Sequence, residues 1–265
     1  MQRILLSLFL FMACYSSKVN AQILNADRFG SKVDSANTLR TAFDLGMKLY
    51  RQKTVILSFN HKLDLSYWFK RNVLILVGKF NLFRSGSKNI LNGGYGHLRF
   101  RPFQHNWFHP EFFTQYQLDG VRGMRERILL GGNARFRITE YDKGRFDIGL
   151  GYMYENEYWD YSGVPDDVLV TEDKPIRNHY TKINFYISYA QKLAETMQIQ
   201  TMFYYQARSD INFIRPRLSL NLNLSFSMTK HIQFLVKYGM IYDAAPVVPI
   251  YNLYYTLLNT LQFRF

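Results

Sequence analysis

Cysteine is almost absent from this sequence, since Cys14 is the one residue of its type among 265. It lies in the stretch "MQRILLSLFLFMACYSSKVNAQ", which combines a basic start, an apolar run and small residues at Val19 and Ala21. This arrangement is typical of a secretory signal over residues 1–21, cleaved after Ala21. A lipoprotein signal would need Cys14 as its lipidated first residue, and "FMAC" fits such a site poorly. We therefore expect a mature chain that enters an oxidising compartment without forming disulfides.

Long apolar runs are missing as well. The apolar run near the N-terminus is well short of the roughly 20 residues that cross a bilayer as a helix. Beyond it we find no helical stretch long enough to cover a sheet, and no linker or charge block that divides the chain. The sequence therefore predicts a polar periplasmic leader over residues 22–36 and one domain over residues 37–265.

Acidic residues are scarce relative to basic ones, with 20 Asp and Glu against 33 Lys and Arg. Such a surplus is often associated with nucleic-acid binding. Here the basic residues alternate with apolar ones instead of forming an exposed stripe, so we expect no nucleic-acid partner. In an exported chain the surplus favours a basic lumen or contact with anionic lipid headgroups.

A strict alternation of apolar and polar residues is what the sequence does contain. In "RPRLSLNLNLSFSM", residues 215–228, leucines, Phe226 and Met228 occupy one parity, while arginine, serine and asparagine occupy the other. A period of two indicates a β-strand with one apolar and one polar face. The pattern recurs and predicts about twelve strands, near residues 38–50, 54–67, 72–83, 92–103, 107–118, 126–139, 145–158, 178–190, 196–208, 213–228, 231–243 and 251–265.

The predicted connections differ at the two ends of the strands. "FKRN", "PFQHN", "EYDKG", "KLAET" and "MTKH" are short, whereas "WDYSGVPDDVLVTEDKPIRN" and "RSGSKNILNG" are longer. This asymmetry is typical of outer-membrane barrels. A soluble barrel with its apolar face inward has the same alternation. The predicted strands, however, exceed the roughly 5–6 residues usual in globular proteins. We therefore predict an all-β, antiparallel, up-and-down transmembrane β-barrel in the outer membrane of a Gram-negative bacterium.

Aromatic residues gather where the predicted strands end, which indicates two girdles at the level of the lipid headgroups. They are Tyr67, Trp68, Phe69, Phe83, Phe103, Trp107, Phe108, Tyr158, Trp159, Tyr242, Tyr251, Tyr254 and Tyr255. The C-terminal stretch "YYTLLNTLQFRF" alternates up to Phe265 and resembles the strand by which barrel-assembly machinery recognises its substrates. The expected partners are therefore the lipid bilayer, lipopolysaccharide and that machinery.

The polar parity of the strands is expected to face the lumen. The candidate lumen-lining residues are Arg99, Arg101, Glu111, Asp119, Arg127, Arg135, Arg137, Asp147, Glu155, Glu157, Lys182, Arg215, Arg217 and Lys237. They allow two interpretations. Buried salt bridges and hydrogen bonds could fill the lumen, because charges away from water must be paired. Alternatively, a narrow passive channel whose surplus of arginine favours anions could pass small solutes.

Signals of catalysis or metal binding are weak, so we predict no catalytic residue, metal or cofactor. The glycine runs "NGGYGH" and "LLGGN" lie within predicted strands, where glycine marks bends or close packing. His105 and His109 have a spacing that could hold a metal on a helix, but they flank a turn rich in aromatic residues. A hydrolase in the barrel wall needs a nucleophile and a base on neighbouring strands, and no spacing singles out such a pair around His61 or His179. A lipid-active outer-membrane hydrolase is the alternative function.

Three stretches in the middle of the chain carry a resemblance to a known family: "NHKLDLSYWFKRNVLILVGKFNLF", "PEFFTQYQLDGVRGMRERILLGGNARFRI" and "GLGYMYENEYW". The matching features are Phe112, Phe113, Asp119, Arg127, Gly131, Gly132, Arg135, Arg137, Glu155 and Glu157. Over roughly residues 55–160 the chain resembles the salt-induced outer-membrane proteins of domain-of-unknown-function family 481. The resemblance implies a barrel in the outer membrane and a link to envelope or salt stress, but no reaction or substrate. Asn133 and Ala134 stand where the family pattern leads us to expect a further glycine.

Overall fold

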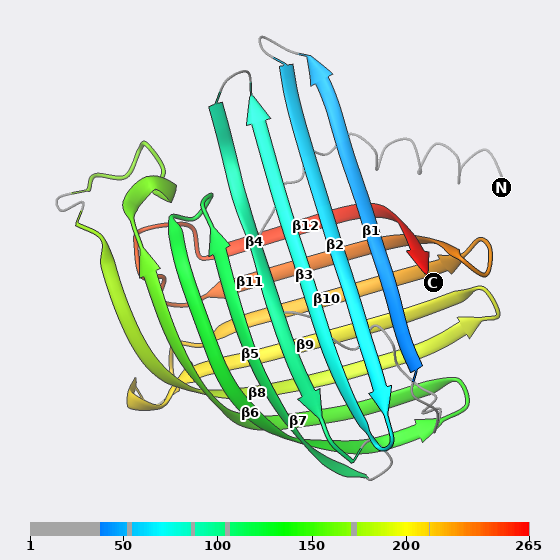
Figure 1. The fold of residues 1–265 in the computed structure, drawn as a ribbon. Coiled ribbons are helices and arrows are strands. Elements are labelled where there is room, and N and C mark those ends of the chain that lie inside the picture. Colours follow the sequence, from blue (N-terminus) through cyan, green and yellow to red (C-terminus); the bar gives the residue numbers. More distant parts are fainter. Residues whose placement is uncertain are drawn as a thin grey trace, which may run out of the picture.

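Twelve antiparallel strands form a closed barrel in the computed structural model, which describes residues 38–51, 55–85, 88–103, 107–170, 174–211 and 213–264 (Figure 1). Each strand pairs with its neighbours in the sequence, and β12 returns to pair with β1. The predicted fold is therefore confirmed, and so is the predicted number of strands. The expected signal, the leader and Phe265 lie outside the described residues. Within the described ranges no helix is long and apolar enough to cross a membrane.

The strands are β1 (Thr38–Arg51), β2 (Val55–Phe69), β3 (Asn72–Ser85), β4 (Lys88–Arg101), β5 (Phe108–Asp119), β6 (Met124–Tyr141), β7 (Gly144–Trp159), β8 (Ile176–Ala194), β9 (Met197–Arg208), β10 (Arg217–Ser227), β11 (Ile232–Asp243) and β12 (Leu253–Arg264). They contain 11 to 19 residues. Since a tilted strand of about 9–11 residues crosses the hydrocarbon layer of a bilayer, each of them is long enough to do so.

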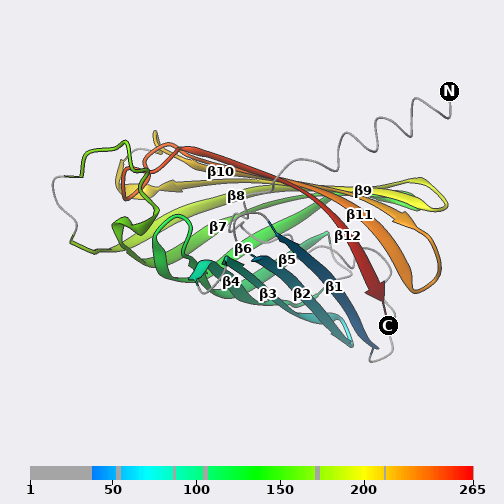
Figure 2. The same cartoon turned by 90° about the horizontal axis from the view of Figure 1, so that it is seen from above.

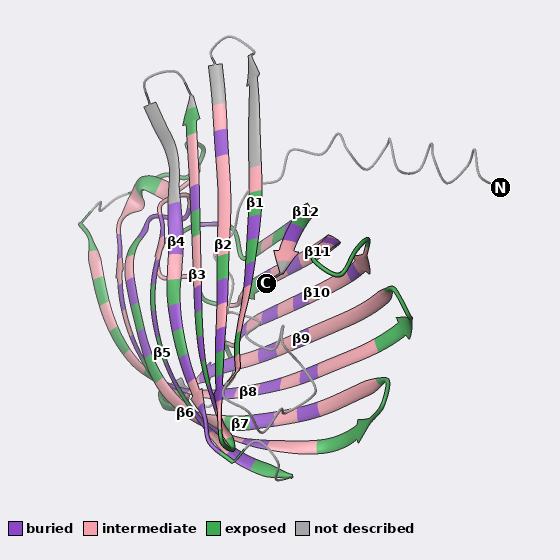
Figure 3. Ribbon diagram, turned by 45° about the vertical axis from the view of Figure 1, so that its right-hand side comes forward, coloured by how far each residue is buried: buried purple, intermediate pink, exposed green. Residues whose placement is uncertain are grey.

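In most strands the polar face points inward. In β10 Ser219 is fully buried and Asn221 is 6% exposed, whereas the leucines that alternate with them, at positions 218, 220 and 222, are half-buried. In β6 and β7 the outward residues Leu130, Leu150 and Tyr152 are 61%, 52% and 62% exposed. Buried and exposed residues therefore alternate along the strands (Figure 3). This distribution is the inverse of that in a water-soluble barrel, whose apolar residues fill the interior.

β3 departs from the alternation because both of its faces are apolar. Val73, Ile75 and Val77 are buried and form a cluster with Trp68 of β2, while Leu74 and Leu76 are exposed. Trp68 and Trp159 were expected in the aromatic girdles, and this expectation is wrong. Both side chains lie on the buried parity of their strands, at 6% and 2% exposure.

The ladder between β1 and β12, which closes the barrel, is short. Among the described residues, the β1–β12 ladder runs through four residue pairs, from Ala42↔Arg264 to Leu45↔Leu261. The next shortest ladder, β4–β5, has eight. Beyond Leu45 the two strands diverge, and they cross at a wide angle in Figure 1. Side chains add to the closure, since Asp44 accepts hydrogen bonds from Lys237 and from Gln262, the latter at 3.0 Å.

Described residues of three long connections gather at one end of the barrel (Figure 2): 160–170 with 174–175, 209–211 with 213–216, and 244–252. The opposite end has tight turns, such as residues 142–143 between β6 and β7 and residues 195–196 between β8 and β9. The expectation of a long loop over "RSGSKNILNG" is wrong, because β3 continues to Ser85 and β4 begins at Lys88. Elsewhere the predicted asymmetry is present.

Candidate functional site in the barrel interior

A first network of charges surrounds Glu111, which β5 places on its fully buried face. The Glu111 carboxylate lies 2.5 Å from Arg101 Nε, 3.1 Å from Arg135 Nη1 and 3.6 Å from Arg99 Nη1. The Tyr186 hydroxyl donates to its second oxygen at 2.6 Å. Strands β4, β5, β6 and β8 thus meet at one carboxylate. Ion pairs and hydrogen bonds of this kind offset the cost of removing the charges from water.

Arg135 links this network to a second carboxylate. Its Nη2 atom donates to Asp147 at 2.8 Å, and Arg145 donates to the same oxygen at 2.7 Å. Arg137 lies 3.8 Å from Asp147 and also donates to Glu140 at 2.8 Å. These contacts join β6 to β7 at the end of the barrel that has the tight turns.

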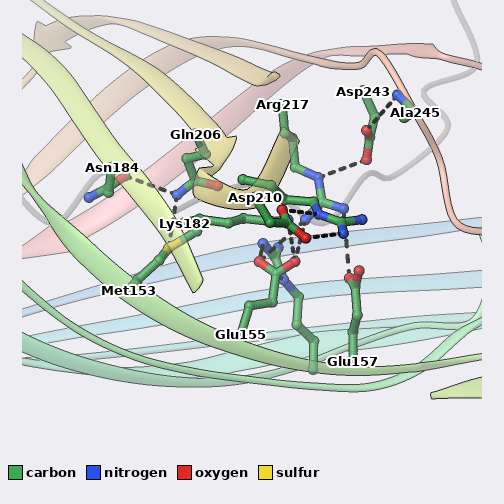
Figure 4. A network of polar contacts seen from close by, with 12 residues as sticks. Met153, Glu155, Glu157, Lys182, Asn184, Gln206, Asp210, Arg217, Asp243 and Ala245 are labelled. Atoms are coloured by element: carbon green, nitrogen blue, oxygen red, sulfur yellow. Dashed lines mark hydrogen bonds and ion pairs between the residues drawn. The ribbon is translucent and has the colours of Figure 1, made fainter. Parts of the chain in front are cut away.

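A second network surrounds Glu155 of β7, which is fully buried (Figure 4). Lys182 Nζ donates to the Glu155 carboxylate at 2.6 Å, Arg217 Nη1 at 3.2 Å and Arg127 Nε at 3.1 Å. Arg217 also donates to Asp243 at 2.8 Å. The contact between Arg217 and Glu155 connects β10 to β7 across the two strands between them.

Neutral side chains fill the space between the two networks. Asn133 donates to Glu111 at 3.5 Å, Asn184 to Asn133 at 2.9 Å and Gln206 to Asn184 at 3.0 Å. Sequence reasoning missed these amides, and it also missed Tyr186, because it considered charged groups alone. The signal that could have found them is their parity, since each shares the buried face of its strand with the charged residues.

The numbers of buried cations and buried carboxylates are equal among the described residues. Among the described residues, seven buried cations (Arg99, Arg101, Arg122, Arg127, Arg135, Lys182 and Arg217) face seven buried carboxylates (Asp44, Asp64, Glu111, Asp119, Asp147, Glu155 and Glu157). The excess of positive charge in the sequence therefore lies outside this buried set. Half-buried residues carry part of it, including Lys62, Lys79, Arg137, Arg145 and Lys237.

The predicted lumen residues occupy different surroundings. Eleven of them are buried: Arg99, Arg101, Glu111, Asp119, Arg127, Arg135, Asp147, Glu155, Glu157, Lys182 and Arg217. Asp119 pairs with Arg122 at 2.6 Å near the β5–β6 turn, and Lys237 pairs with Asp44 at the β1–β12 closure, so both lie apart from the two networks. Arg215 is exposed and precedes β10. The lining of an open channel by these residues stays a prediction.

The loop between β11 and β12 crosses the mouth of the barrel. Its residues Val248 and Ile250 are 1% and 8% exposed and pack against Met124 of β6 and Trp159 of β7. In the strand order, β6 and β7 lie opposite β11 and β12, so the loop spans the opening. Arg122 adds a cation–π contact to Trp159, with 6.0 Å between its guanidinium carbon and the ring centroid.

Carboxylates organise the neighbouring loops. Asp160 accepts hydrogen bonds from Ser162 N at 3.0 Å and from Ser162 Oγ at 2.6 Å, and it pairs with Arg125. Partial burial raises the pKa of Asp160, but these hydrogen bonds outweigh it and hold the pKa below its ordinary value. The hydrogen bond from Arg208 likewise lowers the pKa of Asp210. Both side chains therefore stay ionised at neutral pH.

Histidines and carboxylates are the side chains that could hold a metal ion in the described part of the chain. Within the described ranges no group of three His, Cys, Asp or Glu side chains could hold a metal ion. His105 lies outside these ranges, and His109 is fully buried, with no hydrogen-bond partner at either ring nitrogen in the described part of the chain. His97 contacts Gln115 at 3.0 Å and accepts from Arg99 at 3.3 Å. His179 contacts Tyr154 at 3.0 Å.

Comparison with known proteins gives a family and several distant structures. The family model described as "Protein of unknown function, DUF481" matches residues 28–248. No curated protein matches. The NanC porin is 9% identical, with a TM-score of 0.45, and the alignment covers 86% of this chain and 98% of that chain. The β domain of the Bordetella autotransporter BrkA is 10% identical, with a TM-score of 0.41 and coverages of 88% and 99%. The outer membrane channel DcaP of Acinetobacter baumannii is 8% identical, with a TM-score of 0.35 and coverages of 89% and 99%.

Proposed function

The chain belongs to the DUF481 family, whose description assigns no function, and we propose from the geometry that it is a barrel of the Gram-negative outer membrane whose interior is closed to free diffusion in this conformation. The observation that carries the proposal is the fully buried state of Glu111 and Glu155 inside the barrel. A water-filled channel would leave such carboxylates hydrated.

The outer face supports a position in a membrane. Large apolar side chains are exposed on many of the strands, among them Leu39, Leu63, Leu76, Leu98, Leu130, Leu150 and Leu257. Soluble monomers rarely expose contiguous apolar patches beyond a few hundred Å². In hydrocarbon the same residues are favourable, and a closed barrel satisfies the backbone hydrogen bonds that a bilayer cannot. The exposed Trp107 and Tyr255 suit the headgroup level.

Two features that would block diffusion support the proposal of a closed interior. The Glu111 and Glu155 networks bridge strands across the inside of the β4–β10 wall, and the β11–β12 loop covers the mouth. Diffusion through the barrel therefore requires at least the loop to move. Because half-buried cations such as Lys237 and Arg137 exceed the half-buried acids around them, we expect any residual conductance to favour anions. The stress link and the lipid hydrolase stay predictions that no contact described above supports.

Conductance in planar bilayers tests this proposal. The wild-type protein should show rare, brief openings without a steady open level. Replacing Val248 and Ile250 together by serine should raise the open probability by about tenfold or more. Each substitution removes more than about 1.4 kcal/mol of hydrophobic free energy from the closed position of the loop, and this energy is equivalent to a factor of ten in the equilibrium.

The matched control replaces Val168 and Val170 by serine in the β7–β8 loop, where both are exposed at 36% and 39%. This variant should behave like the wild type. A wild-type barrel that conducts steadily would contradict the proposal, and so would a loop variant with unchanged openings. The reversal potential in a salt gradient measures the ion preference.

A further inference from the structure

A cavity of about 390 Å³ lies at the mouth of the barrel beside the β11–β12 loop. Its walls come from β7, β8, β9, β10 and the end of β11, from Arg215 just before β10, and from residues 245–247 of the loop. The charged residues among them are Glu157, Lys182, Arg208, Arg215, Arg217 and Asp243. The volume falls within the range of roughly 300–1,000 Å³ typical of small-molecule sites.

Glu157 is the unusual member of this wall. It is 1% exposed, and among the described contacts neither of its carboxylate oxygens receives a hydrogen bond. Its nearest cation is Arg217, whose Nη2 atom is 3.6 Å away and which already donates to Asp243 and Glu155 (Figure 4). Buried polar groups in proteins are nearly always hydrogen-bonded, and leaving a charged one without partners is costly. A carboxylate with free acceptor sites on a cavity wall therefore indicates a bound donor.

Most cations of the wall already have partners. Lys182 donates to Glu155, and Arg208 donates to Asp210 at 2.9 Å and lies 3.8 Å from the ring centroid of Tyr180. Arg215 is exposed, and within the described part of the chain it has no ion pair. The cavity thus offers one carboxylate and one guanidinium to a ligand.

We propose that this cavity binds a small zwitterion, an amino acid or short peptide, with its ammonium group at Glu157 and its carboxylate at Arg215. A simple anion would leave Glu157 buried without a donor, and a simple cation would leave Arg215 unused. Apolar residues of the wall, Ile176, Pro246 and Val247, contact the rest of the molecule. The inference goes beyond the closed barrel and rests on the proposed function only for the position of the barrel in the outer membrane.

Isothermal titration calorimetry on the purified mature chain in detergent tests the site, with L-alanyl-L-alanine as the probe. Saturable binding is expected. N-acetylation of the probe removes its ammonium charge, amidation of its C-terminus removes its carboxylate, and each should weaken binding by about tenfold or more, since each removes a charge-assisted hydrogen bond.

Two variants assign the contacts. Glu157→Gln should bind the free and N-acetylated probes equally, and Arg215→Gln should bind the free and amidated probes equally. Arg177→Gln, which changes an exposed arginine outside the cavity, should behave like the wild type. Arg215 is exposed, so we expect Arg215→Gln to fold. If Glu157→Gln fails to fold, Arg215→Gln alone still tests the proposed site.

The absence of saturable binding up to millimolar probe would overturn the inference. So would equal binding of the free and N-acetylated probes by the wild type, which would indicate an anion site. Because the titration needs neither a bilayer nor conductance, its failure is distinguishable from failure of the closed-barrel proposal.

Discussion

Replacement of Glu155 by glutamine should destabilise the barrel by about 3–5 kcal/mol, the usual cost of breaking a buried ion pair by removing one partner. Glu155 is fully buried and pairs with Arg127, Lys182 and Arg217. The substitution keeps the volume of the side chain but leaves three buried cations around a neutral amide. Urea unfolding of the protein in lipid vesicles, monitored by tryptophan fluorescence, measures the change.

Glu195→Gln is the matched control for this prediction. Glu195 pairs with Lys192 at 3.0 Å in the β8–β9 turn, where its side chain is 90% exposed. Exposed pairs of this kind contribute little to stability, so the unfolding midpoint should not change. Equal effects of the two substitutions would show that the Glu155 network is hydrated rather than buried.

Replacement of Gly151 by alanine should also impair folding strongly. A Cβ atom at Gly151 would lie 1.9 Å from the backbone oxygen of Gly132 and 2.6 Å from Asn133 Oδ1. The oxygen belongs to the neighbouring strand of the β6–β7 ladder, so it cannot move without disrupting that pairing. We expect a loss of at least about 1–3 kcal/mol, typical of overpacking, and a lower yield of folded barrel on gels run without heating.

Gly96→Ala is the control for this effect, because a Cβ at Gly96 meets no heavy atom within 4 Å. Its folded yield should equal that of the wild type because the added methyl group has no clash. Both substitutions make the same chemical change in a strand, so any difference between them comes from the contacts of the new Cβ atom. If Gly151→Ala folds as well as Gly96→Ala does, β6 and β7 are farther apart than described.

The fold could be predicted because it depends on a local pattern. In β5, Phe112, Thr114 and Tyr116 are exposed, whereas Phe113, Gln115 and Gln117 are buried. Such alternation along the chain indicates a strand and its two faces without knowledge of its partners. Repetition of this pattern along most of the chain then predicts the closed sheet.

The faces of β3 and the positions of two tryptophans could not be predicted in the same way. "NVLILV" is apolar on both parities, so its buried cluster with Trp68 has no signal in the alternation. A tryptophan at the end of a strand suits both a headgroup girdle and a buried corner. For Trp159 the choice depends on Val248 and Ile250, which lie about 90 residues away in the sequence.

The charged residues of the two networks were predicted to face the lumen, but their arrangement could not be predicted. Parity placed Glu155 and Arg217 on inward faces, but their contact joins positions 62 residues apart and depends on the registers of three ladders. Arg215 shares the parity of Arg217 but precedes the strand and is exposed. The course of the β11–β12 loop across the mouth also had no signal, since "AAPVVPIYN" contains no periodic pattern.

The orientation of the barrel can be measured with nitroxide spin labels at single cysteines, because Cys14, the sole cysteine, lies in the expected signal. One label replaces Leu150, an outward residue in the middle of β7, and the other replaces Trp107, which is 70% exposed just before β5. In lipid vesicles, collision rates with oxygen and with a water-soluble nickel chelate report the depth of each label. The account predicts that the label at position 150 meets oxygen and is protected from nickel, whereas the label at position 107 meets more nickel. Equal and high access of nickel to both labels would contradict it.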